Sequence, residues 1–318
     1  MKISILVVYF GNLPPFVPLF LSSCANNSAI DFLLLGDAWQ TLNGDVPKNC
    51  RILGIGLDEF KKRALAATGI RPGFSSPYKL CDYKPALGAI FERELSGFDY
   101  WGFCDTDIIL GDVMSFLGDL ESYDIFSTCR EYLSGPLFLF RNTERVNRLY
   151  SGSRDIEKVM SSERHYCFDE CSFAWSKLLA GQSILEVDTE IESMTEVIVK
   201  ARDRGEITAH FESLSLEPRR GFKGVVSVDN GRVMMNEQSY IHYHHLHNKG
   251  SSVYTYPKWH WSQVPESYWI NRYGVFGKHG LDIGYRLNQY KNRWLKRVGR
   301  NLSNPLAGGK DNNATKIT

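Results

Sequence analysis

Short apolar runs alternate with helical patterns over the first 110 residues of the chain. The apolar runs are too short for helices and predict buried strands at 3–9, 31–37, 50–56 and 98–105. Apolar positions at helical spacing, or a proline in the opening turn, predict helices at 14–27, 57–69 and 82–95. Strands that alternate with helices in this way predict an α/β fold with a parallel, doubly wound sheet.

The pattern is less regular after residue 120. Two further short strands are predicted at 123–130 and 135–142, a helix at 143–152, and another helix within 163–180. Residues 190–232 are polar and show little periodicity. Asp-Asn-Gly at 229–231 lies between apolar flanks and predicts a hairpin, and a short strand is expected at 239–247.

Composition narrows the functional classes. The 318 residues are 43% hydrophobic and 23% charged, as in an ordinary globular protein, and the net charge of +1 gives no field to attract nucleic acid. The seven cysteines form no CxxC pair, which favours free thiols in a reducing compartment. The apolar start is broken after residue 10, so it predicts a strand rather than a signal peptide. No apolar run reaches membrane-spanning length, so we expect a soluble or peripheral protein.

Two carboxylates follow the strand FDYWGFC. Asp105 and Asp107 are two residues apart, and in an extended segment such residues share a face. Oxygen ligands of this kind suit magnesium and manganese, and magnesium is commonly shared between carboxylates and substrate phosphates. The alternative is an ordinary turn, because aspartates are frequent after strands.

A second group stands at the start of the predicted 82–95 helix. Lys79, Asp82 and Lys84 precede or open this helix, whose N-terminus itself favours an anion. In the functional interpretation the lysines face phosphate, while Asp82 positions a sugar hydroxyl or a partner lysine. In the structural one, this is a solvated helix start with an N-cap aspartate.

Four of the eight histidines lie within six residues. If the segment is a strand, His242 and His244 share one face, and His245 and His247 share the other. One face could add an imidazole to a metal that already has two carboxylates, and Lys249 would follow as a phosphate contact. A zinc site built from several histidines and a solvated strand edge are the alternatives.

Two other segments carry candidate chemistry. Asp169 and Glu170 stand among apolar residues, where they could act as a base or a substrate anchor, or as charges at a helix start. Residues 283–300 predict a helix with an apolar stripe and six cations. This helix would either lie on an anionic membrane surface or pack on the protein itself.

These motifs resemble a known family. A strand that ends in an aspartate pair, with a late histidine followed by lysine and glycine, is similar to GT-A-fold nucleotide-sugar glycosyltransferases. The blocks YFGNLPPF, PYKLCDYKPALGAIF, FDYWGFCDTDIILGD and YIHYHHLHNKG look more closely like a poorly characterised group of bacterial glycosyltransferases. The resemblance covers most of residues 1–250.

The resemblance implies a fold and a domain organisation. It implies a single large GT-A-like domain over 1–260 with a mostly parallel central sheet flanked by helices. Its nucleotide-sugar half would span about 1–120 and its acceptor half about 121–260. A basic helical extension would follow at 261–300, and a disordered tail at 301–318.

The resemblance also implies roles for individual residues. A Mn²⁺ or Mg²⁺ ion would be held by Asp105, Asp107 and His245. The donor would be contacted by Tyr9, Gly11, Asp37, Lys79, Asp82, Asp105 and Lys249. Asp169 and Glu170 would be the catalytic acids near the acceptor.

We therefore expect a hexosyltransferase that takes a nucleotide-sugar donor, preferably a UDP-sugar, and a saccharide or lipid-linked acceptor in surface polysaccharide synthesis. It would be cytoplasmic, at the inner face of the membrane through the 283–300 helix. A sugar nucleotidyltransferase and a non-catalytic carbohydrate-binding protein are the alternative hypotheses. The nucleotidyltransferase should have a glycine-rich loop with a basic residue after the first strand, which YFGNLPPF lacks.

Overall fold

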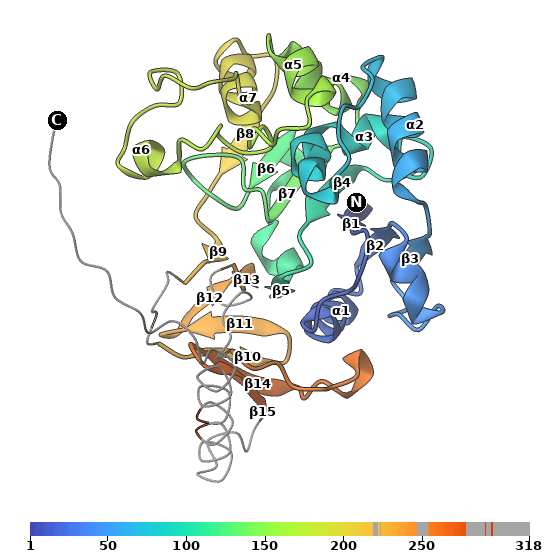
Figure 1. Ribbon diagram of the computed structural model, residues 1–318. Coiled ribbons are helices and arrows are strands. Elements are labelled where there is room, and N and C mark those ends of the chain that lie inside the picture. Colours follow the sequence, from blue (N-terminus) through green and yellow to red (C-terminus); the bar gives the residue numbers. More distant parts are fainter. Residues whose placement is uncertain (219–221, 223, 247–253, 278–289, 291–293, 295–318) are drawn as a thin grey trace, which may run out of the picture.

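The computed structural model describes residues 1–218, 222, 224–246, 254–277, 290 and 294 (Figure 1). Its main element is a seven-stranded sheet in the order β3-β2-β1-β4-β7-β6-β8. The strands are β1 Ile3–Val8, β2 Ile30–Leu35, β3 Cys50–Leu53, β4 Tyr100–Cys104, β6 Ile125–Ser127, β7 Leu137–Arg141 and β8 Ala209–Phe211. All pair in parallel except β7, which runs antiparallel to both of its neighbours.

Helices pack on both faces of this sheet. The α-helices are α1 Val17–Asn26, α2 Leu57–Thr68, α3 Leu87–Ile90, α4 Glu144–Asn147, α5 Ile156–Ser161, α6 Trp175–Leu179 and α7 Met194–Asp203. The 3₁₀ turns are η1 Ala38–Leu42, η2 Pro77–Ala86, η3 Val113–Phe116, η4 Leu120–Ser122, η5 Leu149–Gly152 and η6 Trp261–Gln263. The predicted α/β fold with a mostly parallel central sheet flanked by helices is therefore confirmed.

The two faces of the sheet have separate cores because side chains alternate along each strand. On β1, Leu6 joins a cluster with residues of α2, α3 and α7, whereas Ile5 and Val7 join a second cluster with α1. Trp101 of β4 is fully buried, and its indole N–H donates to Asn147 of α4 at 2.6 Å. The parallel strands thus lie buried on both faces, as their nearly continuous apolar sequences predict.

Two smaller sheets complete the described structure. A five-stranded antiparallel sheet has the order β12-β11-β10-β14-β15, and a three-stranded sheet has the order β5-β13-β9. Their strands are β5 Ile108–Leu110, β9 Ser215–Leu216, β10 Val226–Asp229, β11 Arg232–Met235, β12 Gln238–Tyr240, β13 His242–His244, β14 Ser267–Asn271 and β15 Gly274–Gly277. The hairpin predicted at Asp-Asn-Gly joins β10 to β11, with positive φ angles at Asn230 and Gly231.

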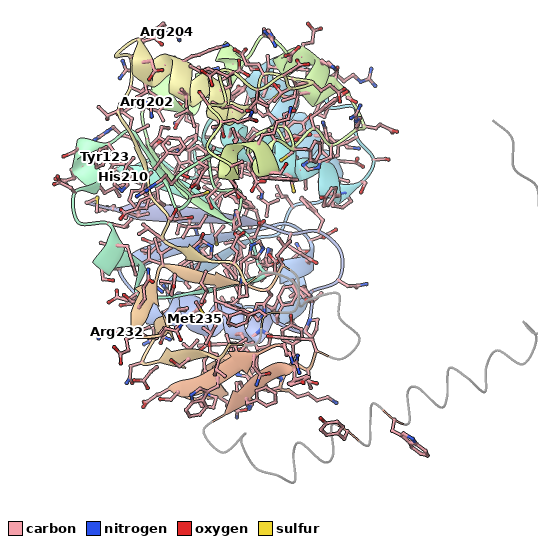
Figure 2. All side chains as sticks on the ribbon, turned by 90° about the vertical axis from the view of Figure 1, so that its left-hand side faces the viewer. Tyr123, Arg202, Arg204, His210, Arg232 and Met235 are labelled. Carbon is pink, nitrogen blue, oxygen red and sulfur yellow. The ribbon has the colours of Figure 1, made fainter. Side chains whose placement is uncertain are left out.

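Figure 2 shows how the sheets are distributed along the molecule. Arg232 and Met235 mark the antiparallel sheet at one end, and Arg202 and Arg204 mark the end of α7 at the other. His210, on the outer strand β8, stacks on Phe126 with 5.1 Å between the ring centroids. The small three-stranded sheet joins chain segments from residues 108, 215 and 242 onwards.

Some predicted elements differ from the structure. The helix expected at 82–95 is instead the end of the 3₁₀ turn η2, the single turn α3 and non-helical turns over 91–95. Pro85 has no N–H with which to continue an α-helix. Residues 261–277, expected in the helical extension, form η6 and the strands β14 and β15. Within the described residues, no helix is long and apolar enough to cross a membrane. Most of the expected 283–300 helix, and the expected tail, lie outside the described residues.

Candidate functional site

A cavity of about 880 Å³ opens beyond the C-terminal ends of β1 and β4. This is the edge at which open parallel sheets bind ligands. Most of the predicted acids line it, together with two histidines and one lysine. The charged and titratable lining residues are Lys84, Asp105, Asp107, His165, Asp169, Glu170, Glu217 and His244, together with the tyrosines Tyr9, Tyr78 and Tyr132 and the cysteines Cys81 and Cys167.

The aspartate pair meets a histidine at the floor of this cavity. Ligand atoms of Asp105, Asp107 and His244 all lie within 4.8 Å of one another. His244 Nε2 lies 3.4 Å from Asp107 Oδ2. The backbone explains this proximity: β13 pairs antiparallel with β5, which opposes His244 to Ile108, and the N–H of His245 donates to the carbonyl of Asp107 at 2.8 Å.

The donor set fits a divalent metal ion. Two carboxylates suit magnesium or manganese, and the imidazole shifts the preference toward manganese and other transition metals. His244 Nδ1 lies 3.0 Å from Glu217 Oε1, so this carboxylate orients the ring with Nε2 toward Asp107. Burial opposes protonation, but the contacts with Asp107 and Glu217 raise the pKa of His244 to about 10. Without a metal ion, the imidazolium of His244 thus offsets negative charge of Asp107 and Glu217 that a bound metal would otherwise offset.

His244, rather than the expected His245, joins the aspartates. Because neighbouring strand residues face opposite ways, the ring of His245 points to the other side and packs against aromatic rings. The closest ring centroids are those of Tyr243 at 4.8 Å and Tyr256 at 5.4 Å. The reserve choice, His247, and the expected phosphate contact, Lys249, lie outside the described residues.

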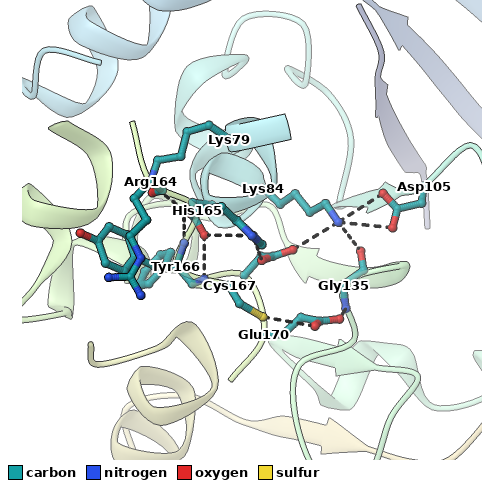
Figure 3. Close-up of polar contacts among 12 residues, drawn as sticks. Lys79, Lys84, Asp105, Gly135, Arg164, His165, Tyr166, Cys167 and Glu170 are labelled. Atoms are coloured by element: carbon teal, nitrogen blue, oxygen red, sulfur yellow. Dashed lines mark hydrogen bonds and ion pairs between the residues drawn. The ribbon is translucent and has the colours of Figure 1, made fainter. Parts of the chain in front are cut away.

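Lys84 connects the metal-ligand group with the acids on the other side of the cavity (Figure 3). Its ammonium lies 3.2 Å from Asp105 Oδ1 and 3.2 Å from Asp169 Oδ2, and it donates to the carbonyl of Gly135 at 3.0 Å. Burial disfavours the ammonium, but the attraction of Asp105 and Asp169 prevails and holds the pKa of Lys84 well above its usual range. Lys84 is therefore a buried, charged cation at the cavity wall.

Lys79 and Asp82, expected to contact the donor, form a buried ion pair behind the cavity wall. Lys79 Nζ lies 2.7 Å from Asp82 Oδ2, and both side chains are essentially inaccessible. Asp82 also accepts hydrogen bonds from the backbone N–H groups of Tyr166 and Phe168 at 2.9 and 2.8 Å. The pair fixes the loop that carries Asp169, and neither residue lines the cavity.

Asp82, His165 and Asp169 also form a group with metal-ligand spacing. Each acid is already compensated, Asp82 by Lys79 and Asp169 by Lys84. We therefore interpret this group as an ion-pair network, which needs no cation for its charge balance.

Glu170, on the same side of the cavity as Asp169, has a raised pKa. Its carboxylate accepts hydrogen bonds from the backbone N–H of Gly135 at 3.0 Å (Figure 3) and from the indole of Trp175 at 2.7 Å. Burial, together with the neighbouring Asp169, raises the pKa of Glu170 to about 7. A carboxyl group with such a pKa can exchange a proton near neutral pH.

The remaining predicted residues lie at the ends of β1 and β2. Tyr9 lines the cavity, whereas Gly11 and Asp37 do not. Asp37 accepts a hydrogen bond from the N–H of Gly11 at 2.9 Å, which ties the two strand ends together. Gly36 has a φ of +124°, and a Cβ there would lie 2.0 Å from the carbonyl oxygen of Tyr9, so only glycine fits.

Glu217 is a site residue that the sequence analysis missed. It follows β9 within residues 190–232, where no periodicity predicted a strand. Glu217 comes to lie beside His244 because β9 pairs with β13, and this pairing leaves no pattern in the local sequence. Lys84 was predicted together with Lys79 as a phosphate contact. It lies in the 3₁₀ turn η2, next to Pro85, and lines the cavity.

Comparison with known proteins assigns the chain to a family. Residues 5–275 match the model of a family of unknown function, DUF6625. The chain belongs to the DUF6625 family. No curated protein matches this DUF6625 member.

Solved structures similar to the DUF6625 chain include two sugar transferases. One is the galactosyltransferase LgtC in complex with donor and acceptor sugar analogs, with 12% identity and a TM-score of 0.32 over 68% of this chain and 76% of that one. The other is mouse xyloside xylosyltransferase 1 in its apo form, with 8% identity and a TM-score of 0.38 over 69% and 88%. Similarity of this degree transfers no residue role to this chain. The narrower resemblance to a group of bacterial glycosyltransferases stays a prediction.

Proposed function

We propose that this protein is a metal-dependent glycosyltransferase that moves a hexose from a nucleotide-sugar donor, preferably a UDP-sugar, to a saccharide or lipid-linked saccharide. The observation on which this rests is the convergence of Asp105, Asp107 and His244 at the floor of an 880 Å³ cavity. A cavity of this size can hold a nucleotide sugar. The motif resemblance described above supports the same activity.

Asp105, Asp107 and His244 would hold the metal ion, and Glu217 would keep the imidazole in place. When bound, a divalent cation neutralises negative charge on the diphosphate of the donor and on the departing nucleoside diphosphate. Lys84 lies between Asp105 and Asp169 and offsets part of their negative charge. Tyr9, at the end of β1, would border the nucleotide.

The acids opposite the metal-ligand group would serve the acceptor. In the transfer, an acceptor hydroxyl oxygen forms a bond to the anomeric carbon, and the bond from that carbon to the phosphate oxygen breaks. The hydroxyl proton passes to a carboxylate on the acceptor side. Glu170, with a pKa of about 7, is suited to take it, while Asp169 is held by Lys84 within the same wall.

Titration calorimetry with uridine diphosphate tests the metal bridge. Binding is expected in the presence of Mn²⁺ and should be lost in a chelator. Asp107→Asn should remove the Mn²⁺-dependent binding without unfolding the protein, because the amide nearly preserves the shape of the buried carboxyl group. Asp58→Asn, at a side chain 94% exposed on α2, is the matched control and should bind as the wild type does.

Two results would refute the proposal. Uridine diphosphate that binds equally well in chelator would exclude the metal bridge. Undiminished transfer or donor hydrolysis by Asp107→Asn would exclude the site. A panel of nucleotide sugars, screened for thermal stabilisation with Mn²⁺, then identifies the donor.

A further inference from the structure

A row of aromatic rings borders the acidic side of the cavity. His165 lies between Tyr78 and Phe173, with 4.9 and 5.6 Å between the ring centroids, and Trp175 follows at 5.5 Å from Phe173. We call Tyr78, His165, Phe173 and Trp175 the aromatic row. Tyr78 is 68% exposed and Phe173 is 45% exposed, which is unusual for rings that could instead bury their apolar surface.

The backbone under Phe173 is strained. Phe173 has a φ of +64° and Ser172 a φ of +51°, in the left-handed region that bulky L-residues rarely adopt. The ring of Phe173 remains 45% exposed, so its burial offsets this strain only in part. Strained backbone of this kind is concentrated at ligand-binding and catalytic sites. A half-exposed ring held in this way, in contact with His165 and Trp175, is a candidate contact for a ligand.

Hydrogen bonding fixes one end of the row beside the acids. The indole N–H of Trp175 donates to Glu170 at 2.7 Å, which orients the ring toward the cavity. Tyr78, His165 and Trp175 line the same cavity as Asp169 and Glu170, whereas Phe173 is not part of the lining and contacts His165 and Trp175. Flat apolar surface and hydrogen-bonding carboxylates thus meet at one place.

We infer that the aromatic row is the subsite that binds the acceptor as a saccharide ring, an inference that rests on the proposed function. A pyranose has an apolar C–H face and a rim of hydroxyl groups. Its apolar face would lie on the exposed rings, while its hydroxyls reach Asp169, Glu170 and His165. An alkyl chain would contact the rings but leave the carboxylates unused, so the mixed chemistry favours a sugar.

Saturation-transfer NMR with methyl glycosides of glucose, galactose and N-acetylglucosamine tests this subsite. At least one glycoside should bind the wild type. Phe173→Gly should weaken that binding about tenfold, the effect of losing the apolar contact of one ring. The thermal midpoint of Phe173→Gly should be no lower than that of the wild type, because glycine tolerates the positive φ. Phe173→Tyr should retain binding, and Leu185→Ala, at another exposed apolar side chain, should leave it unchanged.

Several outcomes would overturn the inference. The inference is wrong if the wild type binds none of the three glycosides, or if Phe173→Gly binds its glycoside as tightly as the wild type. It is also wrong if octyl glucoside binds where methyl glucoside does not, because that would indicate an alkyl site. Uridine diphosphate binding with Mn²⁺ should be unchanged in Phe173→Gly. If the wild type fails to bind uridine diphosphate but binds a glycoside through Phe173, the proposed transfer reaction falls while the saccharide subsite stands.

Discussion

Replacing Glu170 by glutamine should change how the stability of the protein depends on pH. The carboxyl group has a pKa of about 7 when folded, against 4.5 for the ordinary side chain. The folded state therefore binds more protons between pH 4.5 and 7, so this group stabilises the fold fully below pH 4.5, and that contribution is lost as the pH rises to 7. The difference of pKa corresponds to about 3 kcal/mol.

Glu170→Gln lacks this titration. Relative to the wild type, the free energy of unfolding of the variant should rise by about 3 kcal/mol between pH 4.5 and 8. Urea unfolding at several pH values, in chelator, measures this difference. Glu186→Gln, at an exposed side chain, is the control and should follow the wild type at every pH.

A parallel pH dependence of Glu170→Gln and wild type would contradict this expectation. It would mean that the carboxyl group of Glu170 is not sufficiently desolvated by its surroundings to favour the neutral form. The groups that determine its environment are Asp169, Lys84, Cys167 and the indole of Trp175.

Two further predictions concern the cations of the site. Lys84→Met should lower the free energy of unfolding by about 3 kcal/mol, because Asp105 and Asp169 lose a buried partner. Urea unfolding measures this free energy, and a loss below about 1 kcal/mol would contradict the ion-pair role. His244→Ala should abolish Mn²⁺-dependent binding of uridine diphosphate. His245→Ala should preserve this binding but lower the free energy of unfolding by about 2 kcal/mol, because aromatic packing is lost. Calorimetry and thermal unfolding of both variants decide this, and the opposite pattern would restore His245 as the ligand.

The parallel half of the fold was predictable because its strands are buried on both faces. Runs such as ISILVV and IDFLLL contain only one polar residue each, Ser4 and Asp31, so their apolar patterns are unambiguous. The strands β5 and β9 have only three and two residues, too few for a period to appear. They form because β13 pairs with both of them, and that is a tertiary effect.

Asp105, Asp107, Asp169 and Glu170, predicted from the sequence, line the cavity, whereas the acid Glu217 and the histidine beside the aspartates were not predicted. Asp105 and Asp107 follow a buried strand, and this local pattern sufficed to single them out. Which of two adjacent histidines turns toward them depends on the register of β13 against β5, which no local pattern specifies. The sequence likewise could not show that Lys79 pairs with Asp82, leaving Lys84 to line the cavity.

The pairing of β5 with β13 has a consequence for biosynthesis. Asp105 and Asp107 emerge from the ribosome well over a hundred residues before His244, which lies beside them in the folded protein. A nascent chain can therefore form its parallel strands before the proposed metal site is complete. If Asp105, Asp107 and His244 hold a metal ion as proposed, a chain cut short before residue 242 would lack one of the three ligands.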